Sequence, residues 1–136
     1  MKPVFGDAHY FIAFLNPTDN DHERATRWTA TVSRVIVTTE FVLTEVADGM
    51  AKIDRRHTFG PYWRHIAQHP KIRVVPASRE LFARGMEMYL KHMDKEWTLT
   101  DCISFVVMDD QGLTEALTAD RHFVQAGMIP LLRPPD

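Results

Sequence analysis

The sequence predicts an α/β protein with three layers, in which a mainly parallel central sheet carries helices on both faces. Short apolar runs alternate along the chain with longer segments of helical periodicity. The clearest run, over residues 35–37, has three apolar residues between polar neighbours, which is typical of a strand buried in a parallel sheet. Strands that alternate with helices are joined by right-handed crossovers, and the helices then cover both faces of the sheet.

The first half of the chain predicts two strands and three helices. A short apolar strand ends at Asp7, and an apolar helical segment follows until Asn16 and Pro17 stop it. After the second strand, Thr38 or Thr39 can cap a helix whose apolar residues recur at helical spacing. We expect strands over 4–6 and 35–37, and helices over 10–15, about 19–31 and about 40–52.

The second half predicts three more strands, separated by helices. Residues 54–57 form a charged stretch that we expect to be a basic turn, and Pro61 suits the first turn of the next helix. Pro130 indicates that the last strand lies at an edge of the sheet. We expect helices over 61–69, 78–93, 97–108 and 121–126, and strands over 72–75, 116–118 and 128–132.

Size and composition indicate an ordinary soluble domain. The 136 residues fit one domain, residues 1–136, with 45% hydrophobic and 25% charged residues. The formal net charge of −2 means that any contact with nucleic acid requires a local basic patch. No stretch resembles a signal peptide or a membrane span, so we expect a cytoplasmic protein. Cys102 is the single cysteine; it follows an acid that opposes a low thiol pKa, and we expect it in the core.

Four acids fall where a parallel sheet places its functional site. Asp7 and Asp120 follow predicted strands, and Glu45 lies about two turns into the helix after the second strand. In open parallel sheets the site lies beyond the carboxyl ends of the strands. Asp101 lies in an apolar helix with no Lys or Arg within a helical turn. Holding such a carboxylate costs several kcal/mol unless it faces water or a cation compensates it.

Gathered carboxylates favour a divalent cation. Two charges about 4 Å apart repel by about 4 kcal/mol at an effective dielectric constant of about 20. A bound ion or a protonated acid relieves this, and oxygen ligands suit Mg²⁺ or Mn²⁺ better than Zn²⁺. Glu40 is a rival to Glu45, because a separation of five positions is roughly 140° of helix rotation. We choose Glu45, since Glu40 in the first turn complements the helix dipole.

The surroundings of these acids form four motifs in chain order. They are VFGD at 4–7, TTEFVLTE at 38–45, WTLTD at 97–101 and LTADRHF at 117–123. Together they resemble PIN-domain ribonucleases of the VapC type, the toxins of type II toxin–antitoxin pairs. The resemblance implies a Mg²⁺- or Mn²⁺-dependent endoribonuclease with a metal-activated water as nucleophile. It also implies an RNA substrate, a cognate antitoxin and a homodimer, with these metal-ligating and catalytic residues: Asp7, Glu45, Asp101 and Asp120.

The chain departs from the family pattern directly after the first acid. Where such proteins often carry hydroxyl side chains, this sequence has Ala8 and His9. The sequence therefore does not identify the group that orients Asp7, and His9 is one candidate. Asp120 can be a helix cap, a metal ligand or both. His122 can position a phosphate or cover the edge of the sheet, and we favour the second role. A PIN-like binding module without catalysis is the main alternative function.

A receiver-type signalling domain is a weaker alternative. Receivers need an acidic pair after the first strand and a Lys at the end of the last strand, and the sequence has neither.

Two further clusters of side chains have two interpretations each. They are either ordinary surface or core residues, or they form binding surfaces. A basic cluster could contact RNA: Arg55, Arg56, Arg64, Lys71 and Arg73. An apolar cluster could take an antitoxin helix or a second copy of the chain: Trp28, Phe59, Tyr62, Trp63 and Ile66.

Overall fold

A computed structural model describes residues 1–134 and confirms the predicted fold class. Its sheet has five strands in the order β3-β2-β1-β4-β5, and every neighbouring pair among the described residues is parallel. The sequence order of the strands reverses between β1 and β4, which lie side by side at the centre. The strands are β1 (Val4–Gly6), β2 (Ile36–Thr39), β3 (Ile72–Val75), β4 (Glu115–Leu117) and β5 (Ile129–Pro130).

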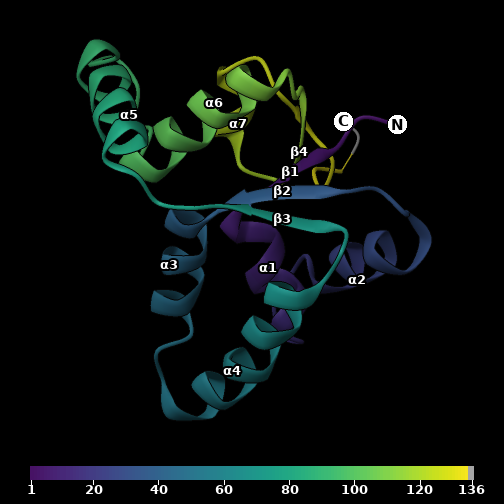
Figure 1. The fold of residues 1–136 in the computed structure, drawn as a ribbon. Helices are drawn as coiled ribbons and strands as arrows, with labels where there is room; N and C mark the ends of the chain where they lie inside the picture. The colour runs from purple at the N-terminus through teal and green to yellow at the C-terminus, as the bar shows by residue number, and fades with distance from the viewer. Residues whose placement is uncertain (135–136) are drawn as a thin grey trace.

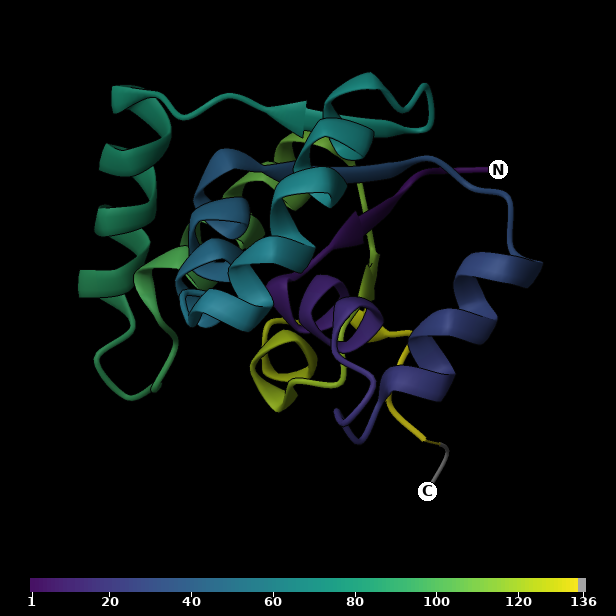
Figure 2. The same ribbon diagram turned by 90° about the horizontal axis from the view of Figure 1, so that it is seen from below.

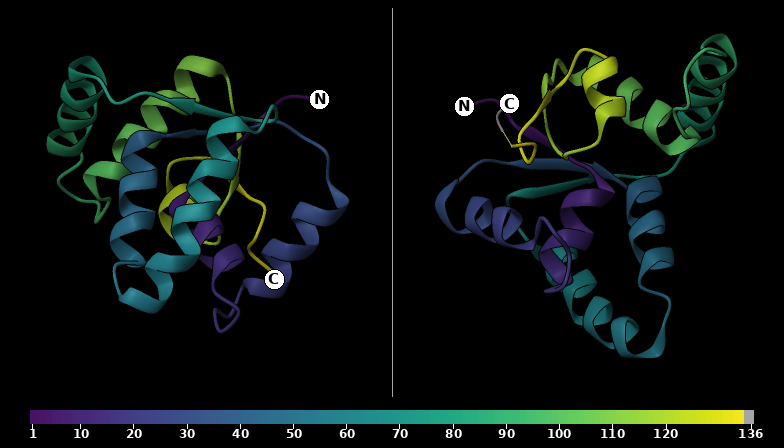
Figure 3. Two further views of the ribbon diagram at one scale, coloured as in Figure 1. Left: turned by 60° about the horizontal axis from the view of Figure 1, so that its bottom comes forward. Right: turned by 180° about the vertical axis from the view of Figure 1, so that it is seen from behind.

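Helices cover both faces of the sheet, as expected (Figure 1). One face carries α1 (Ala8–Leu15), α2 (His22–Thr31), α3 (Glu40–Gly49) and α4 (Ile53–Gln68). The other carries α5 (Arg79–Lys91), α6 (Leu99–Gln111) and α7 (Arg121–Gln125). The view from behind in Figure 3 shows the same two groups on opposite sides. Figure 2 shows α5 at one end of the molecule and α2 at the other.

The core is formed where α6 covers the centre of the sheet. Residues 101–108 of α6 are all buried, because the helix lies between the sheet and α5. Phe123 of α7 packs against Phe105 of α6 and Phe5 of β1, at ring-centroid distances of 5.0 Å and 6.5 Å. Within residues 1–134, no helix combines the length and the apolar character that a membrane span requires.

Helix caps fall where the polar residues predict them. Thr39, and not Thr38, caps α3 by accepting a hydrogen bond from the backbone N–H of Val42. The Thr38 hydroxyl instead donates to the Gly6 carbonyl at 2.8 Å and ties the ends of β1 and β2 together. Ser78 caps α5. The two threonine contacts fix the carboxyl ends of β1 and β2, where the predicted site lies.

The predicted basic turn at 54–57 is wrong, because these residues form the first turn of α4. Exposed charged residues are compatible with a helix, and Asp54 in the first turn complements the helix dipole. Pro61 therefore lies inside α4 and does not begin a helix. The final strand, β5, is shorter than predicted but does lie at an edge. The helix predicted over 97–108 runs instead to Gln111, where Gly112 ends it with a φ of +66°.

Gly85 sets the distance between α5 and α6. A Cβ at this position would overlap Ile103 Cγ1 and approach Ile103 Cα to 3.3 Å. We predict that Gly85→Ala destabilises the protein by about 1–2 kcal/mol in urea unfolding, since overpacking costs more than the roughly 1 kcal/mol gained in helix propensity.

Gly60 provides the matched control for this prediction. It also lies inside a helix, but a Cβ there would meet nothing within 4 Å. Gly60→Ala should therefore raise the free energy of unfolding by about 0.5–1 kcal/mol. Equal effects of the two substitutions would show that the contact with Ile103 does not limit the packing of α5.

Candidate functional site

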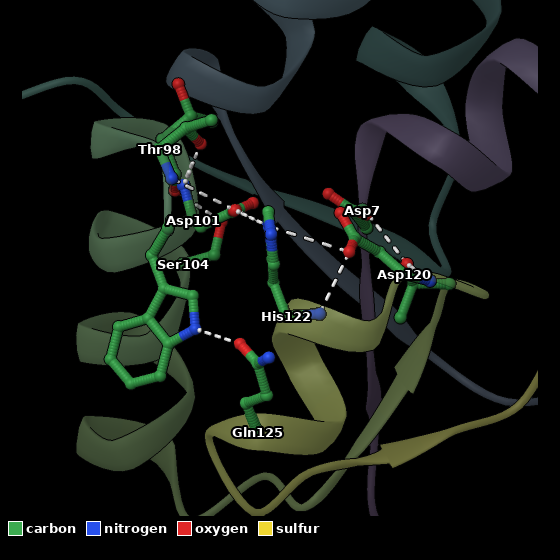
Figure 4. Close-up of polar contacts among 10 residues, drawn as sticks. Asp7, Thr98, Asp101, Ser104, Asp120, His122 and Gln125 are labelled. Carbon is green, nitrogen blue, oxygen red and sulfur yellow. Dashed lines mark hydrogen bonds and ion pairs between the residues drawn. The ribbon is translucent and has the colours of Figure 1, made fainter. Parts of the chain in front are cut away.

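The four acids predicted from the sequence meet at the carboxyl end of the sheet. Asp7 directly follows β1, and Asp120 follows β4, the neighbouring strand across the point where the strand order reverses. Asp101 lies in the first turn of α6 and Glu45 in the second turn of α3. Figure 4 shows the carboxyl groups of Asp7, Asp101 and Asp120 directed toward one another. The site thus lies beyond the carboxyl ends of the strands, as expected, and the structure adds that this is the point where the strand order reverses.

Asp101 is held at the amino end of α6 by a capping box. The Thr98 hydroxyl accepts a hydrogen bond from the Asp101 N–H at 3.0 Å, and Asp101 Oδ2 accepts one from the Thr98 N–H at 3.2 Å. His122 Nδ1 lies 3.0 Å from the same Oδ2. Oδ1 has no hydrogen-bond partner among residues 1–134. Since no buried side-chain oxygen there lacks a partner, Oδ1 is open to solvent or a ligand.

A threonine from β4 orients the first acid. Asp7 is 5% exposed, and its Oδ2 accepts a hydrogen bond from the Thr118 hydroxyl at 2.8 Å. Thr118 Oγ1 in turn accepts the backbone N–H of Asp120 at 3.0 Å. His9 does not take this role, because its Nε2 pairs with Asp21 at 2.7 Å. The hydroxyl that the sequence lacks after Asp7 is therefore supplied by Thr118, which the sequence analysis missed.

Glu45, and not Glu40, lies beside the other acids. Burial raises the pKa of Glu45, and repulsion from Asp101 and Asp120 raises it further. Glu40 instead accepts the backbone N–H of Ala77 at 2.6 Å. The choice between the two glutamates thus agrees with their positions in the structure.

Asp120 has the capping role that the sequence suggested. Its Oδ1 accepts the backbone N–H of His122 at 2.9 Å and begins α7. Its side chain is 36% exposed, against 8% for that of Asp101. The second oxygen remains available, so the cap does not compete with metal binding.

His122 lies between Asp101 and Asp120, which the sequence analysis did not anticipate (Figure 4). Its side chain is 17% exposed, and Nδ1 lies 3.6 Å from Asp120 Oδ1 as well as near Asp101. One ligand atom from each of these three residues lies within 4.8 Å of the others. The sequence did contain a signal, since a His two positions after an acid at a helix start can turn back toward that acid.

The electrostatics of the cluster are unfavourable without a cation. Burial raises the pKa of Asp7 to about 7; the Thr118 hydrogen bond opposes this shift, while Asp101 and Glu45 add to it. Burial also raises the pKa of Asp101, against the hydrogen bonds from Thr98 and His122. Among residues 1–134, no Lys or Arg forms an ion pair with any of the four acids, and His122 is the one basic side chain that contacts them. Their oxygens therefore suit a hard divalent cation such as Mg²⁺ or Mn²⁺.

Comparison with known protein families decides what kind of domain carries this site. The PIN-domain model matches residues 4–128, which include all four acids. The chain belongs to the PIN-domain family. This assignment confirms the resemblance that the four sequence motifs indicated and rules out the receiver alternative.

Individual PIN-domain relatives agree with the family assignment. The chain is 27% identical over 128 residues to the 23S rRNA-specific endonuclease VapC20 of Mycobacterium tuberculosis, covering 93% of this chain and 95% of VapC20. The crystal structure of VapC20, described as a sarcin-ricin loop cleaving toxin, superposes with a TM-score of 0.84 at 25% identity, over 93% of this chain and 96% of that one. The crystal structure of FitAcB from Neisseria gonorrhoeae superposes with a TM-score of 0.65 at 18% identity, over 93% of this chain and 94% of that one. At this identity it supports the fold alone.

The remaining candidate groups of this PIN domain have other roles. Cys102 is fully buried, and burial raises the pKa of its thiol to about 11, so it is the core thiol that we expected. The apolar cluster is divided. Ile66 belongs to the core, whereas Trp28 and Tyr62 line a groove of about 700 Å³ between α1, α2 and α4. The five residues of the basic cluster are exposed, four of them on α4 and β3 and Lys71 in the turn between these elements.

We predict that Asp7→Asn changes how stability depends on pH. In metal-free wild type the folded state keeps the Asp7 proton up to a pH of about 7, while the unfolded chain releases it near 3.8. The folded state therefore holds more protons in this range, and the free energy of unfolding falls as the pH rises from 4 to 7. The asparagine has no such loss and can still accept the Thr118 hydrogen bond.

Urea unfolding in chelator at pH 5 and 7.5 measures this effect. Between pH 5 and pH 7.5, the free energy of unfolding of Asp7→Asn should rise by about 2–3 kcal/mol relative to that of wild type. Asp109→Asn, on an exposed site at the end of α6, is the matched control and should follow the wild type. Parallel pH profiles for all three proteins would contradict the burial of an ionisable Asp7.

Proposed function

We propose that this PIN domain is a divalent-metal-dependent endoribonuclease that hydrolyses RNA phosphodiester bonds and acts as the toxin of a type II toxin–antitoxin pair. The observation that carries the proposal is the convergence of four acids, without a Lys or Arg partner among residues 1–134, at the switch point of the sheet. The likeness to VapC20, whose name describes an rRNA endonuclease, supports the same reaction for this chain. Such a substrate would place its action in the cytoplasm.

The four acids would hold the metal: Asp7, Glu45, Asp101 and Asp120. When bound, Mg²⁺ or Mn²⁺ supplies an activated water and stabilises the negative charge that develops on the scissile phosphate. Asp101 would contribute Oδ1, because its Oδ2 already accepts two hydrogen bonds. Thr118 holds Asp7 and the backbone of Asp120 in a fixed relation. Since burial raises the pKa of Asp7 to about 7, metal binding below that pH would release its proton, and the affinity should rise with pH.

A loop of ribosomal RNA is the substrate class that the comparison favours. VapC20 is described as cleaving the sarcin-ricin loop, and it shares the fold with this chain over most of both lengths. The surface carries exposed basic side chains on α4 and β3 that could bind phosphates. We therefore propose structured rRNA loops as the first substrates to test.

We predict that Asp101→Asn lowers the rate of cleavage of such a loop in Mg²⁺ or Mn²⁺ by at least about a hundredfold. Loss of a residue that only supports a metal ligand costs up to about a hundredfold, and loss of the ligand itself should cost more. Gel analysis of an end-labelled stem–loop RNA measures the rate. Asp109→Asn should cut like wild type. The same Mn²⁺ at a hundredfold excess over its dissociation constant should stabilise wild type by about 2.7 kcal/mol, but not Asp101→Asn.

The outcomes separate this function from its main alternative. A wild type that binds RNA but does not cut it in either metal, and that gains no stability from Mn²⁺, would be the PIN-like binding module without catalysis. Cleavage that persists in chelator and in Asp101→Asn would contradict the proposed chemistry altogether.

An antitoxin segment is the partner proposed for the groove between α1, α2 and α4. Aromatic side chains line it, namely Tyr10, Phe14, Trp28 and Tyr62. His65, His69 and Lys71 lie along the same groove and would complement acidic residues that flank an apolar anchor. The groove adjoins the amino ends of β2 and β3, so an antitoxin bound there would reach the acids only through a further segment.

A second copy of the chain is proposed to pack against α5. This helix has two apolar stripes. One faces α6, and the other is exposed, with Phe82 at 41%, Tyr89 at 43% and Leu90 at 58%; Met93, at 80%, lies just beyond the end of the helix. An exposed apolar stripe of this kind on a helix is typical of a surface that another chain covers.

We predict that Leu90→Glu converts a dimer into a monomer, because it introduces a charge into the exposed stripe. Light scattering across a range of protein concentrations measures the mass. Lys91→Glu changes the charge at the next position, which faces another direction on the helix, and should leave the dimer intact. A wild type that is monomeric at every concentration would exclude the α5 interface.

A further inference from the structure

His122 makes one short polar contact in the acid cluster through its side chain. Nδ1 lies 3.0 Å from Asp101 Oδ2, which is hydrogen-bond distance, and 3.6 Å from Asp120 Oδ1, which is too long. Because Asp101 offers an acceptor, the ring nitrogen that faces it is the one that carries a proton. Nδ1 is therefore a donor and has no lone pair for a cation, and Nε2 lies on the other side of the ring.

The contact with His122 is the second hydrogen bond that restrains the Asp101 carboxylate. Thr98 N–H and His122 Nδ1–H both bind Oδ2, one from the start of α6 and the other from α7. Rotation of the carboxylate would move Oδ2 away from both donors. Oδ1 is thus left facing the space that Asp101 shares with Asp7 and Asp120 (Figure 4).

We propose that His122 is a positioning residue, which from α7 fixes the carboxylate of Asp101 so that Oδ1 is presented to the divalent cation. This inference rests on the proposed function, since it assumes that the four acids bind a metal. An imidazole suits the role because its planar ring places a single N–H donor against Oδ2. A Lys or Arg at this position would neutralise the acids and compete with the cation.

The surroundings allow His122 to be changed without loss of the arrangement of α6 and α7. Trp97 Nε1 donates to Gln125 Oε1 at 3.0 Å, and this second link joins the segment before α6 to the end of α7. Phe123 also anchors α7 in the core. A substitution at His122 therefore removes the donor to Asp101 and leaves the rest of α7 in place.

Two isosteric substitutions distinguish positioning from other roles. In His122→Asn the amide nitrogen occupies the place of Nδ1, whereas in His122→Gln it occupies the place of Nε2. Calorimetric titration with Mn²⁺ should give His122→Asn an affinity within about threefold of wild type. His122→Gln and His122→Ala should bind about 10- to 100-fold more weakly. Equal losses in the asparagine and glutamine variants, or no loss in the glutamine variant, would overturn the proposal.

A measurement on the wild type keeps the test independent of how the variants fold. In ¹⁵N-labelled, metal-free protein at neutral pH, the imidazole correlations of His122 should show the tautomer with the proton on Nδ1. A proton on Nε2 alone would overturn the proposal. If wild type shows the Nδ1 tautomer but binds no Mn²⁺, the proposed metal-dependent function fails, and with it the role of His122 toward a cation.

Discussion

Repulsion among buried carboxylates is the constraint around which this molecule is built. The sheet brings the ends of β1 and β4 together, and the acids that follow them are drawn into a partly dry pocket with those of α3 and α6. Thr118 and the capping box of α6 stabilise two of these carboxylates by hydrogen bonds without cancelling their charge. A fold that gathers carboxylates without Lys or Arg partners is suited to bind a cation. A cluster whose acids were paired with basic side chains would not be.

The fold class could be predicted from the sequence because apolar strands and amphipathic helices alternate so regularly. The order of the strands could not, since pairing of β1 with both β2 and β4 depends on long-range contacts that leave no local pattern. The beginning of α4 was mistaken because charged residues were interpreted as a turn, whereas a solvated helix accepts them. Local chemistry predicted the cap of α7 at Asp120 and narrowed the cap of α3 to Thr38 or Thr39, of which the structure has Thr39.

In the site, as in the fold, features set by neighbouring residues could be predicted from the sequence, and contacts between distant segments could not. The acids stand out singly in the sequence, and the preference for Glu45 over Glu40 followed from helix geometry alone. The groups that orient them did not stand out: Thr118 reaches Asp7 only because β1 and β4 are neighbours. His9, adjacent to Asp7 in sequence, turns toward α2 instead. Proximity along the chain was therefore a poor guide to the outer contacts of the cluster.

The burial of α6 on two sides has a consequence for how the site fluctuates. Amide groups in a helix enclosed between a sheet and another helix exchange with solvent only in the rarest openings of a protein. Asp101 begins that helix, so its turn is part of the most cooperative region, while Asp120 lies at the start of a short, partly exposed helix. The pocket thus has one acid on a helix that is enclosed on two sides and another on a segment that water reaches more readily.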